Sequence, residues 1–483
     1  MMMTQEQAFL KAQTQLSGIE TFVEQAADGG QRIDQVEREL FSQLLALGRT
    51  LLEAFVARQG DGDVGAESKT ADGRRLRRLK DQHERRYLSI FGELLIRRQV
   101  YAEREKQQIE RVPLDERLGS PAGEFSYVLE DWLQRLCVKE SFHEAVGDLR
   151  QLLGVAPSER AAEQISQRLA EHAEAFGAQC IPSPDEEAEL LVATADGKGV
   201  PMRRPSTERV RSGPRRGKGE KANKKQMAYV GAVYTVDRFR RSADDVVDEL
   251  ARKECAPNRP SPQHKQVWAE MTRVQEGEAC SGRERLFAEM AVACHQRDLQ
   301  RHKTLVCLMD GEAALWSVAG EWLPRAVGVL DLFHVLERLW QAAYCLHPEK
   351  SRSAEQFVTH RLRMLLEGKV GYVIGGLKRL RDGLAGEKRR TMTTVIGYYE
   401  NNRQHMRYDE YLSAGYPIGS GVAEGACRHV VKDRMEQTGM RWTVSGAQAM
   451  LHLRALYLNG WWNDYIDYHV ETEQAELYAQ LAA

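Results

Sequence analysis

The chain has 483 residues, and at about 100–200 residues per domain several structural units are expected. Hydrophobic residues make up 42% and charged residues 29%, an ordinary globular composition that excludes a disordered chain. Mean hydropathy is -0.52, and no uncharged apolar stretch approaches the roughly 18 residues of a membrane helix. The N-terminus lacks the pattern of an export signal. We therefore expect a cytoplasmic protein with no membrane partner.

The eight cysteines are scattered without any CxxC pair. This spacing argues against a zinc ribbon and a disulfide framework, and it suits a reducing compartment. Cys280, Cys294 and His295 are close enough in sequence to share a metal, but buried free thiols are the favoured interpretation.

The net charge is only -2, yet cations gather in two blocks. Ten Lys or Arg lie between Lys69 and Arg98, and ten more lie between Arg203 and Lys225 against two Glu, a net of +8. Two such blocks in a nearly neutral chain indicate a polyanion partner.

The N-terminal part has the patterns of helices followed by a small β region. Leucines recur at helical spacing from Leu40 to Leu52, so residues 1–60 are expected to be helical. The Gly/Asp-rich segment 60–73 is typical of a linker, and SIFGELLIRRQVYAE at 89–103 predicts a β-hairpin.

Residues 141–176 contain two amphipathic helical patterns joined by the short polar turn VAPSER. This is the pattern of a DNA-binding helix-turn-helix. It is equally the pattern of an ordinary helical hairpin, and both interpretations stay open.

From residue 187 the pattern changes to short apolar runs between helical segments. The runs EAELLVATAD (187–196), MAYVGAVYTV (227–236), TLVCLMD (304–310) and RAVGVLD (325–331) are expected to be strands. Residues 346–415 return to a helical pattern. The sequence therefore predicts an α/β unit with a helical segment inside it.

Three acidic positions stand out by their context. Asp196 and Asp310 each end an apolar run beside a glycine, and Glu424 follows a Pro/Gly-rich turn that opens a helical stretch. Each alone suits turn formation or helix capping. Together with the basic segment 203–225, they match what two-metal phosphodiester chemistry requires.

The segments DGKGVPM, LMDGEAALW, DLFHVLERLW and YPIGSGVAEGACRHVVKDRMEQTGMRW together resemble the ISKra-type insertion-sequence transposases, a bacterial DDE family. The resemblance covers roughly residues 85–460. It implies a ribonuclease H-like mixed-sheet catalytic core, with catalytic and metal-binding Asp196, Asp310 and Glu424. It also implies that Mg²⁺ is the cofactor, with Mn²⁺ able to substitute.

On this basis six regions are expected along the chain. They are an N-terminal helical region at 1–60, a basic linker and β-hairpin at 61–135, and a helix-turn-helix-like DNA-binding region at 136–186. The catalytic core follows at 187–345 and 416–483, interrupted by a helical insertion at 346–415.

Several further residues are predicted to contact DNA. Asp331 and His334 form a D-x-x-H motif shared by several DDE families, in which His334 would contact DNA while Asp331 caps a helix. Arg428 and Lys432, at i+4 and i+8 from Glu424, share its helix face. Further predicted contacts are Arg434, Arg441 and Trp442, and Arg215, Arg216, Lys218, Lys224 and Lys225 of the basic segment. For Trp442 alone, a core position is the commoner role.

The expected function is therefore transposition: binding of double-stranded DNA at element ends and target, followed by cleavage and strand transfer. A homo-oligomer, a dimer or larger, is expected because two ends must be held together, and the setting would be the bacterial nucleoid. Three alternatives remain: a ribonuclease H-fold nuclease that only cuts, a DNA-binding regulator or domesticated transposase without strand transfer, and an enzyme of small phosphate esters. The two cationic blocks have no use in the last.

Overall fold

The computed structural model describes residues 5–70, 73–105, 108–182, 187–203, 225–252, 258–275, 278–437 and 439–478. Two compact units divide the chain. The terminal unit comprises Met1–His172 with Trp462–Ala483, and the central unit comprises Ala173–Trp461. Each unit is described separately below.

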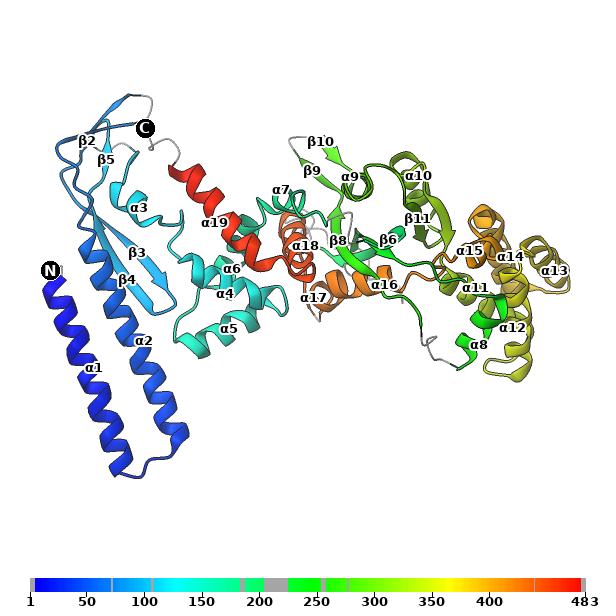
Figure 1. The fold of residues 1–483 in the computed structure, drawn as a ribbon, viewed down its shortest axis with the longest axis horizontal. Helices are drawn as coiled ribbons and strands as arrows, with labels where there is room; N and C mark the ends of the chain where they lie inside the picture. Colours follow the sequence, from blue (N-terminus) through cyan, green and yellow to red (C-terminus); the bar gives the residue numbers. More distant parts are fainter. Residues whose placement is uncertain are drawn as a thin grey trace, which may run out of the picture. The chain divides into compact units, whose positions relative to one another are not determined.

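The terminal unit begins with an antiparallel helical hairpin of α1 (Gln5–Asp28) and α2 (Ile33–Arg58) (Figure 1). Ala12, Ile19 and Ala26 of α1 are buried at a spacing of seven residues, the repeat of a helix seam. The helical pattern predicted for residues 1–60 is confirmed over the described part of this segment.

Among the described residues, one helix is long and apolar enough to cross a membrane by length and composition, and it is α2. Only 17% of its most apolar window is buried. The criterion applied to the sequence is an apolar stretch without charged residues. The helix α2 does not meet it, because it carries Arg49 and Glu53 in its second half. Length and composition alone are weak evidence for a membrane helix, because core helices of other proteins meet the same criteria.

Short strands follow the helical hairpin. β1 (Glu67–Lys69), β2 (Arg75–Arg78) and β5 (Tyr101–Ala102) form a three-stranded sheet, and β3 (His83–Ser89) pairs with β4 (Gly92–Arg98). The hairpin predicted over 89–103 therefore lies over 83–98. Its turn is at Ser89–Gly92, where Gly92 has a φ of 116°, so the predicted range contained only the second strand.

The remainder of the terminal unit is helical: α3 (Pro113–Leu118), α4 (Tyr127–Cys137), α5 (Phe142–Leu153), α6 (Glu159–Leu169) and α19 (Trp462–Tyr478). Ser141 and Glu144 form a capping box at the start of α5, and Gly154 ends it in the left-handed conformation. Ser158 caps α6. These caps explain why the chain turns at 154–158.

The central unit is built on a five-stranded mixed sheet in the order β12-β11-β6-β7-β8. Its strands are β6 (Leu190–Pro201), β7 (Lys225–Val236), β8 (Gln263–Met271), β11 (Thr304–Met309) and β12 (Val327–Leu330). β6, β7 and β8 are antiparallel neighbours, whereas β11 runs parallel to β6 and β12 parallel to β11. A small pair, β9 (Arg273–Gln275) and β10 (Glu278–Cys280), follows β8. The α/β prediction is confirmed at this level.

Helices cover both faces of this sheet. Leu190 and Val192 of β6 pack with residues of α11 (Leu332–Leu346), α12 (Arg352–Leu366), α13 (Val370–Asp382) and α14 (Gly386–Asn402). Leu191 and Ala193, which point the other way, pack against α9 (Gly282–Gln296) and α10 (Ala313–Trp322). Burial on both faces explains why the strands are continuous apolar runs in the sequence.

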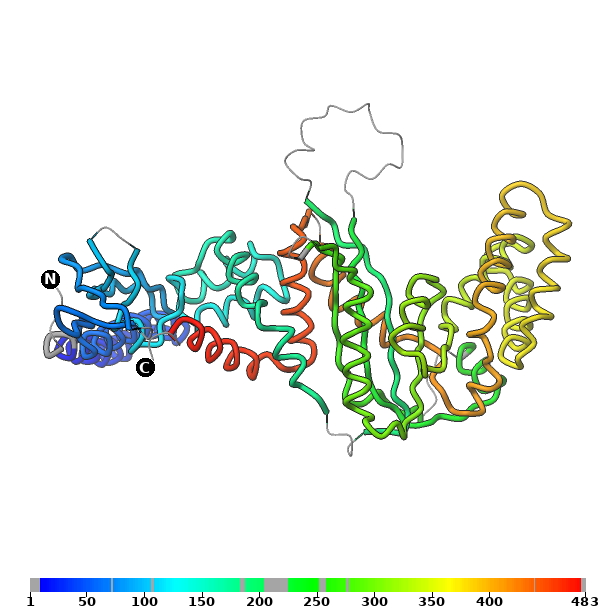
Figure 2. Tube along the Cα trace, turned by 90° about the horizontal axis from the view of Figure 1, so that it is seen from above, coloured from blue at the N-terminus to red at the C-terminus, as the bar shows by residue number. Residues whose placement is uncertain are grey.

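The remaining described helices of this unit are α7 (Ala173–Gly177), α8 (Ala243–Arg252), η3 (Arg403–His405), α15 (Tyr408–Ala414), α16 (Gly421–Cys427), η4 (Arg428–Lys432), α17 (Asp433–Met435) and α18 (Val444–Leu458). Figure 2 shows α12–α14, in yellow to orange, gathered beside one part of the sheet. The helical segment expected at 346–415 corresponds to α12–α15.

Two glycines test the packing of the central unit. A Cβ on Gly282, at the start of α9, would lie 2.6 Å from the carbonyl carbon of Met271 and 2.7 Å from the amide nitrogen of Thr272. Because these are backbone atoms, which cannot move away without distorting the β8–α9 connection, Gly282→Ala should destabilise the protein by about 1–3 kcal/mol. A Cβ on Gly375, inside α13, meets nothing within 4 Å, so Gly375→Ala should stabilise by about 0.5–1 kcal/mol.

Thermal unfolding of the two variants beside wild type checks this pair. Equal shifts of the two midpoints, or a stabilised Gly282→Ala, would contradict the packing at the β8–α9 junction.

Candidate active site

Three aspartates lie on or directly after three adjacent parallel strands: Asp196 within β6, Asp310 after β11 and Asp331 after β12. Asp196 lies in β6 three residues after Ala193, whose register partner in β11 is Cys307. Asp310 lies three residues after Cys307 and follows β11, so it matches Asp196 in register. Asp331 follows β12, where its amide nitrogen donates to the carbonyl of Met309 at 2.8 Å. The carboxyl ends of parallel strands thus bring these side chains to one edge of the sheet.

Asp331 is fully buried and is the most extensively hydrogen-bonded of the three. Its Oδ1 accepts from the amide nitrogens of Phe333 at 3.1 Å and Ser420 at 3.2 Å. Its Oδ2 accepts from His334 Nδ1 at 2.8 Å and Ser420 Oγ at 2.7 Å. Burial alone would raise the pKa of Asp331, but these hydrogen bonds outweigh it and hold the pKa below its usual value. The predicted capping role of Asp331 is confirmed.

His334 is the cation of the cluster. The hydrogen bond to Asp331 raises its pKa to about 9 against the opposing effect of burial, and the nearby carboxylates of Asp310 and Glu424 add to the rise. Its side chain is about one-third exposed. A protonated imidazole whose Nδ1 is held by Asp331 keeps Nε2–H as a donor for an anion.

Asp310 and Glu312 carry negative charge that no cation fully balances. Burial raises the pKa of Asp310, and the neighbouring carboxylate of Asp196 adds to it. Glu312 is half-buried, and burial and Asp310 raise its pKa too, although Arg283 lies 3.9 Å away. Raised carboxyl pKa values at adjacent positions indicate a site that would gain from a bound cation.

Glu424 reaches the same region from α16. The helix begins at Ser420, which is hydrogen-bonded to Asp331, and Cys427, one turn after Glu424, lies against the carboxylate of Asp196. Ligand atoms of Asp331, His334 and Glu424 all lie within 4.8 Å of one another. The structure therefore brings Asp196, Asp310 and Glu424 to one region, with Asp331, His334 and Glu312 among them.

These groups differ in what they can bind. The four acceptor positions of Asp331 are already used, and a protonated His334 is no metal ligand. Asp196 Oδ1 accepts from the amide nitrogen of Gly197 at 2.7 Å, Asp310 Oδ1 accepts from that of Glu312 at 3.0 Å, and Glu424 is exposed. Oxygen donors of this kind suit a hard divalent cation such as Mg²⁺.

The residues predicted to follow Glu424 on its helix face are exposed. In an α-helix Lys432, eight residues on, would be rotated by about 80° from Glu424. Residues Arg428–Lys432 instead form a π-helical turn, which has more residues per turn and brings Lys432 closer to that face. Arg428 lies 3.6 Å from Asp433, and Val431 is buried.

Arg434 and Trp442 need correction as predicted DNA contacts. Both are buried, the guanidinium of Arg434 lies over the Trp442 ring at 5.0 Å, and Trp442 Nε1 donates to the carbonyl of Met435 at 3.2 Å. Neither side chain is available to DNA in this structure, so we retain neither. Arg441 is exposed.

Most of the basic segment lies outside the described residues, including Arg215, Arg216, Lys218 and Lys224. Its position between β6 and β7 follows from the two strands. Lys225, the first residue of β7, is paired with Glu436. Lys198, two residues after Asp196, is a nearby cation that the sequence interpretation left out.

The first basic block is neutralised within its own unit. Residues 61–124 contain 14 Lys or Arg and 13 Asp or Glu. Ion pairs join Arg74 to Glu103 and Glu110, Arg78 to Asp63, Arg85 and Arg98 to Asp115, Arg86 to Glu93, and Arg97 to Glu84. The expectation of a polyanion partner for this block is therefore weakened, because sequence distance hid the compensating acids.

The helix pair α5–α6 is also poor in excess positive charge. Residues 142–169 contain three Arg and four Asp or Glu. Arg168 of α6 is engaged with Glu130 and lies 3.4 Å from Glu473. These contacts favour the ordinary helical hairpin over a DNA-binding helix-turn-helix.

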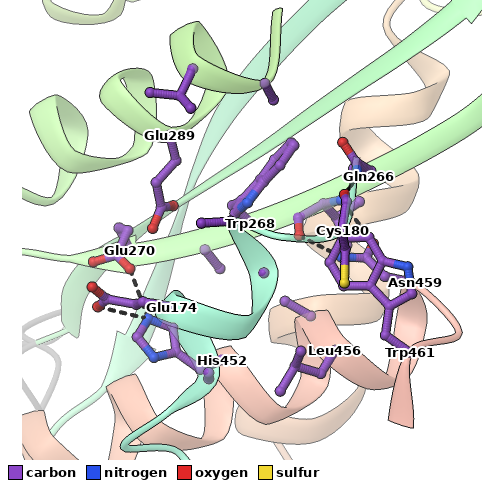
Figure 3. Close-up of a pocket in the computed structure, with 18 of the residues that line it drawn as sticks. Glu174, Cys180, Gln266, Trp268, Glu270, Glu289, His452, Leu456, Asn459 and Trp461 are labelled. Atoms are coloured by element: carbon purple, nitrogen blue, oxygen red, sulfur yellow. Dashed lines mark hydrogen bonds and ion pairs between the residues drawn. The ribbon is translucent and has the colours of Figure 1, made fainter. Parts of the chain in front are cut away.

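A second acidic cluster lies in the central unit, at one end of a cavity of about 270 Å³ (Figure 3). Ligand atoms of Glu174, Glu270 and His452 lie within 4.8 Å of one another. Unlike the strand-end site, this cluster is balanced by arginines: Arg273 lies 3.0 Å from Glu174, and Arg285 lies 3.5 Å from Glu270. The network joins α7, β8, α9 and α18, and its compensated charges suit a structural role.

Residues 293–470 match the model of UPF0236, an uncharacterised protein family. The matched segment contains Asp310, Asp331, His334 and Glu424, whereas Asp196 precedes it. Comparison with proteins of curated function gives no significant match.

Asp331→Asn tests the buried carboxylate. The side-chain amide nitrogen of Asn is a donor, and it would face groups that are themselves donors, so one or two of these groups would lose their acceptor. The free energy of unfolding should therefore fall by about 2–4 kcal/mol. The pKa of His334, measured by NMR, should fall from about 9 because its main stabilising partner is lost. The control is Asp237→Asn, an exposed aspartate directly after β7. Equal stability of both variants, or an unchanged His334 pKa, would contradict the network.

Glu289 of α9, beside the second cluster (Figure 3), provides a test by pH. Burial raises its pKa from 4.5 to about 8, and the nearby Glu270 adds to the shift. Between these values the unfolded chain loses a proton that the folded state keeps, so the free energy of unfolding falls as pH rises. Glu289→Gln has no proton to lose and should be more stable than wild type above pH 8, by about 1–3 kcal/mol.

At pH 4, below both pKa values, the difference should shrink, because both states then hold a mostly neutral carboxyl. Exposed Glu321→Gln is the control. A difference between Glu289→Gln and wild type that does not change with pH would contradict this assignment.

Proposed function

We propose that this chain is a DDE-type DNA transposase that cleaves and joins DNA strands with Mg²⁺ held by Asp196, Asp310 and Glu424. The observation that carries the proposal is the proximity of Asp196, within β6, to Asp310, directly after the neighbouring strand β11, with Glu424 brought in by α16. Burial and, secondarily, the neighbouring carboxylate of Asp196 raise the pKa of Asp310, which fits a site that a divalent cation would complete.

The topology of the central unit supports a ribonuclease H-like core. β6, β7 and β8 are three antiparallel strands. On the other side of β6 the sheet continues with β11 and then β12, both parallel to β6. Asp196 lies on the first strand of this sheet, Asp310 follows the fourth, and Glu424 lies on a later helix. This is the placement that the resemblance implies for the three carboxylates.

When bound, Mg²⁺ would activate a water or a 3′-hydroxyl and stabilise the leaving oxygen. Hydrolysis would break a P–O3′ bond at the element end and leave a 3′-hydroxyl. That hydroxyl would then attack a phosphorus atom of target DNA and displace the 3′-hydroxyl of the target strand. Mn²⁺ has oxygen-ligand preferences close enough to substitute.

The surrounding residues would hold the DNA rather than the metal. His334 presents a protonated Nε2–H beside the carboxylates, and Asp331 fixes the orientation of its ring. This donor suits a phosphate oxygen next to the reacting bond. Lys198, on β6, and Arg428, Lys432 and Arg441, which follow Glu424 in the sequence, would contact further phosphates.

Two alternatives differ in what the site does. A nuclease with the same carboxylates would cut without joining. A DNA-binding regulator would do neither, and the partly balanced charge of Asp196, Asp310 and Glu312 would then have no use.

A strand-transfer assay separates these functions. Purified full chain, Mg²⁺ or Mn²⁺ and linear DNA that carries the flanks of the gene should give joined products. Asp196→Asn, Asp310→Asn and Glu424→Gln should each lower joining by at least about 100-fold, because each removes a metal-binding oxygen. DNA binding should persist, and Asp237→Asn should retain activity.

Cleavage without joining would favour the nuclease. DNA binding with neither cleavage nor joining, under either metal, would favour the regulator.

A further inference from the structure

One face of the α1–α2 hairpin carries large apolar side chains that the described structure leaves exposed. On α1 these are Phe9, Leu16 and Val23, seven residues apart, and on α2 they are Phe41, Leu44, Leu51 and Phe55. The exposed fractions of these residues lie between 41% and 52%. We call these two sets the outer stripes. Contiguous apolar surface of this kind marks an interaction site.

The outer stripes are separate from the contact that holds the hairpin together. That contact uses Ala12, Ile19 and Ala26 of α1, with Thr50 and Ala54 of α2, and all five are buried. Each helix therefore has two apolar stripes, of which the hairpin itself buries one.

Both outer stripes lie on the same side of the hairpin. At about 100° per residue, the outer stripe is rotated from the buried stripe of its own helix by roughly 60° on α1 and roughly 115° on α2, in both cases in the direction of chain progression. The two helices run antiparallel (Figure 1). Rotation in the same sense on two antiparallel helices that face one another directs both stripes to one face.

The stripe on α2 also has the spacing of a helix-pairing seam. Phe41, Leu44, Gly48, Leu51 and Phe55 follow one another at intervals of three and four residues. The ring of Phe91, from the β3–β4 turn, packs where a Cβ of Gly48 would lie. The β3–β4 hairpin thus covers the α2 stripe at Gly48. The four large side chains of that stripe stay exposed.

We propose that the outer stripes are the contact between two copies of this chain, paired as a four-helix bundle. A two-fold axis places the same face of each copy against the other, so one self-complementary seam serves both. At 24 residues, α1 is about 36 Å long, and two helices side by side present a face about 20 Å wide. The resulting area of roughly 700 Å² per copy is close to the roughly 800 Å² of a stable interface.

The net charge of the α1–α2 hairpin argues against DNA or an anionic lipid surface as the partner of the outer stripes. Residues 5–58 contain eight Asp or Glu and five Lys or Arg, a net negative segment. DNA and anionic lipid surfaces both require excess cations beside the contact. A second copy requires none. The inference concerns the chain without nucleic acid and stands apart from the proposed chemistry.

The mass of the full-length chain in solution, without DNA, tests the proposal by size-exclusion chromatography with light scattering. Wild type should elute as a dimer of 54.8 kDa chains at micromolar concentration. Leu16→Glu combined with Leu51→Glu would bury charge without a partner, so dimerisation should weaken by at least about 100-fold. The control, Leu152→Glu, changes an exposed leucine of α5 and should remain dimeric.

Circular dichroism of each variant should match wild type, which confirms that the helices are intact. A wild-type monomer, a dimer that survives the double substitution, or a Leu152→Glu control that is also monomeric would each overturn the proposal. Flotation with vesicles of anionic phospholipid is the second measurement. Binding of a monomeric wild type to these vesicles would assign the face to a membrane instead.

Discussion

Four hydrogen bonds converge on the carboxylate of Asp331, which has no exposed surface. They join the end of β12 to the first turn of α11 and to the residue that precedes α16. Glu424 is carried by α16, and His334 by α11. Asp331 therefore fixes where both side chains lie relative to the strand ends, and the rest of the candidate site depends on this one buried charge.

The two acidic clusters of the central unit show how compensation distinguishes a structural network from a binding site. Around Glu174 and Glu270, two arginines and a histidine balance the carboxylates. Around Asp196 and Asp310, the nearest basic groups balance only part of the charge: His334 is already paired with Asp331, and Arg283 lies 3.9 Å from Glu312. Residual negative charge at these positions is what a divalent cation would neutralise.

The strands and the carboxylates that follow them could be predicted from sequence, because strands that are buried on both faces consist of continuous apolar runs. TLVCLMD ends in Asp310 for this reason, and RAVGVLD ends in Asp331. Glu312 was missed, although the DGE segment places it two residues from Asp310, where a turn folds it back beside that carboxylate.

Interactions between distant segments left no such local pattern. Asp115, which pairs with Arg85 and Arg98, lies 30 and 17 residues from them, so the first charge block looked unopposed. The burial of Arg434 under Trp442 depends on tertiary packing, and the π-helical turn that brings Lys432 closer to the face of Glu424 has no signature in the spacing of the residues.

The central claim is that the strand-end carboxylates, and not the Glu174–Glu270 cluster, form the divalent-cation site. Titration of the full chain with Mn²⁺, followed by electron paramagnetic resonance, tests it without any assumption about the DNA. Mn²⁺ should bind wild type and Glu174→Gln alike and should bind Asp310→Asn at least about tenfold more weakly. Binding that Asp310→Asn leaves unchanged, or that Glu174→Gln removes, would contradict the account.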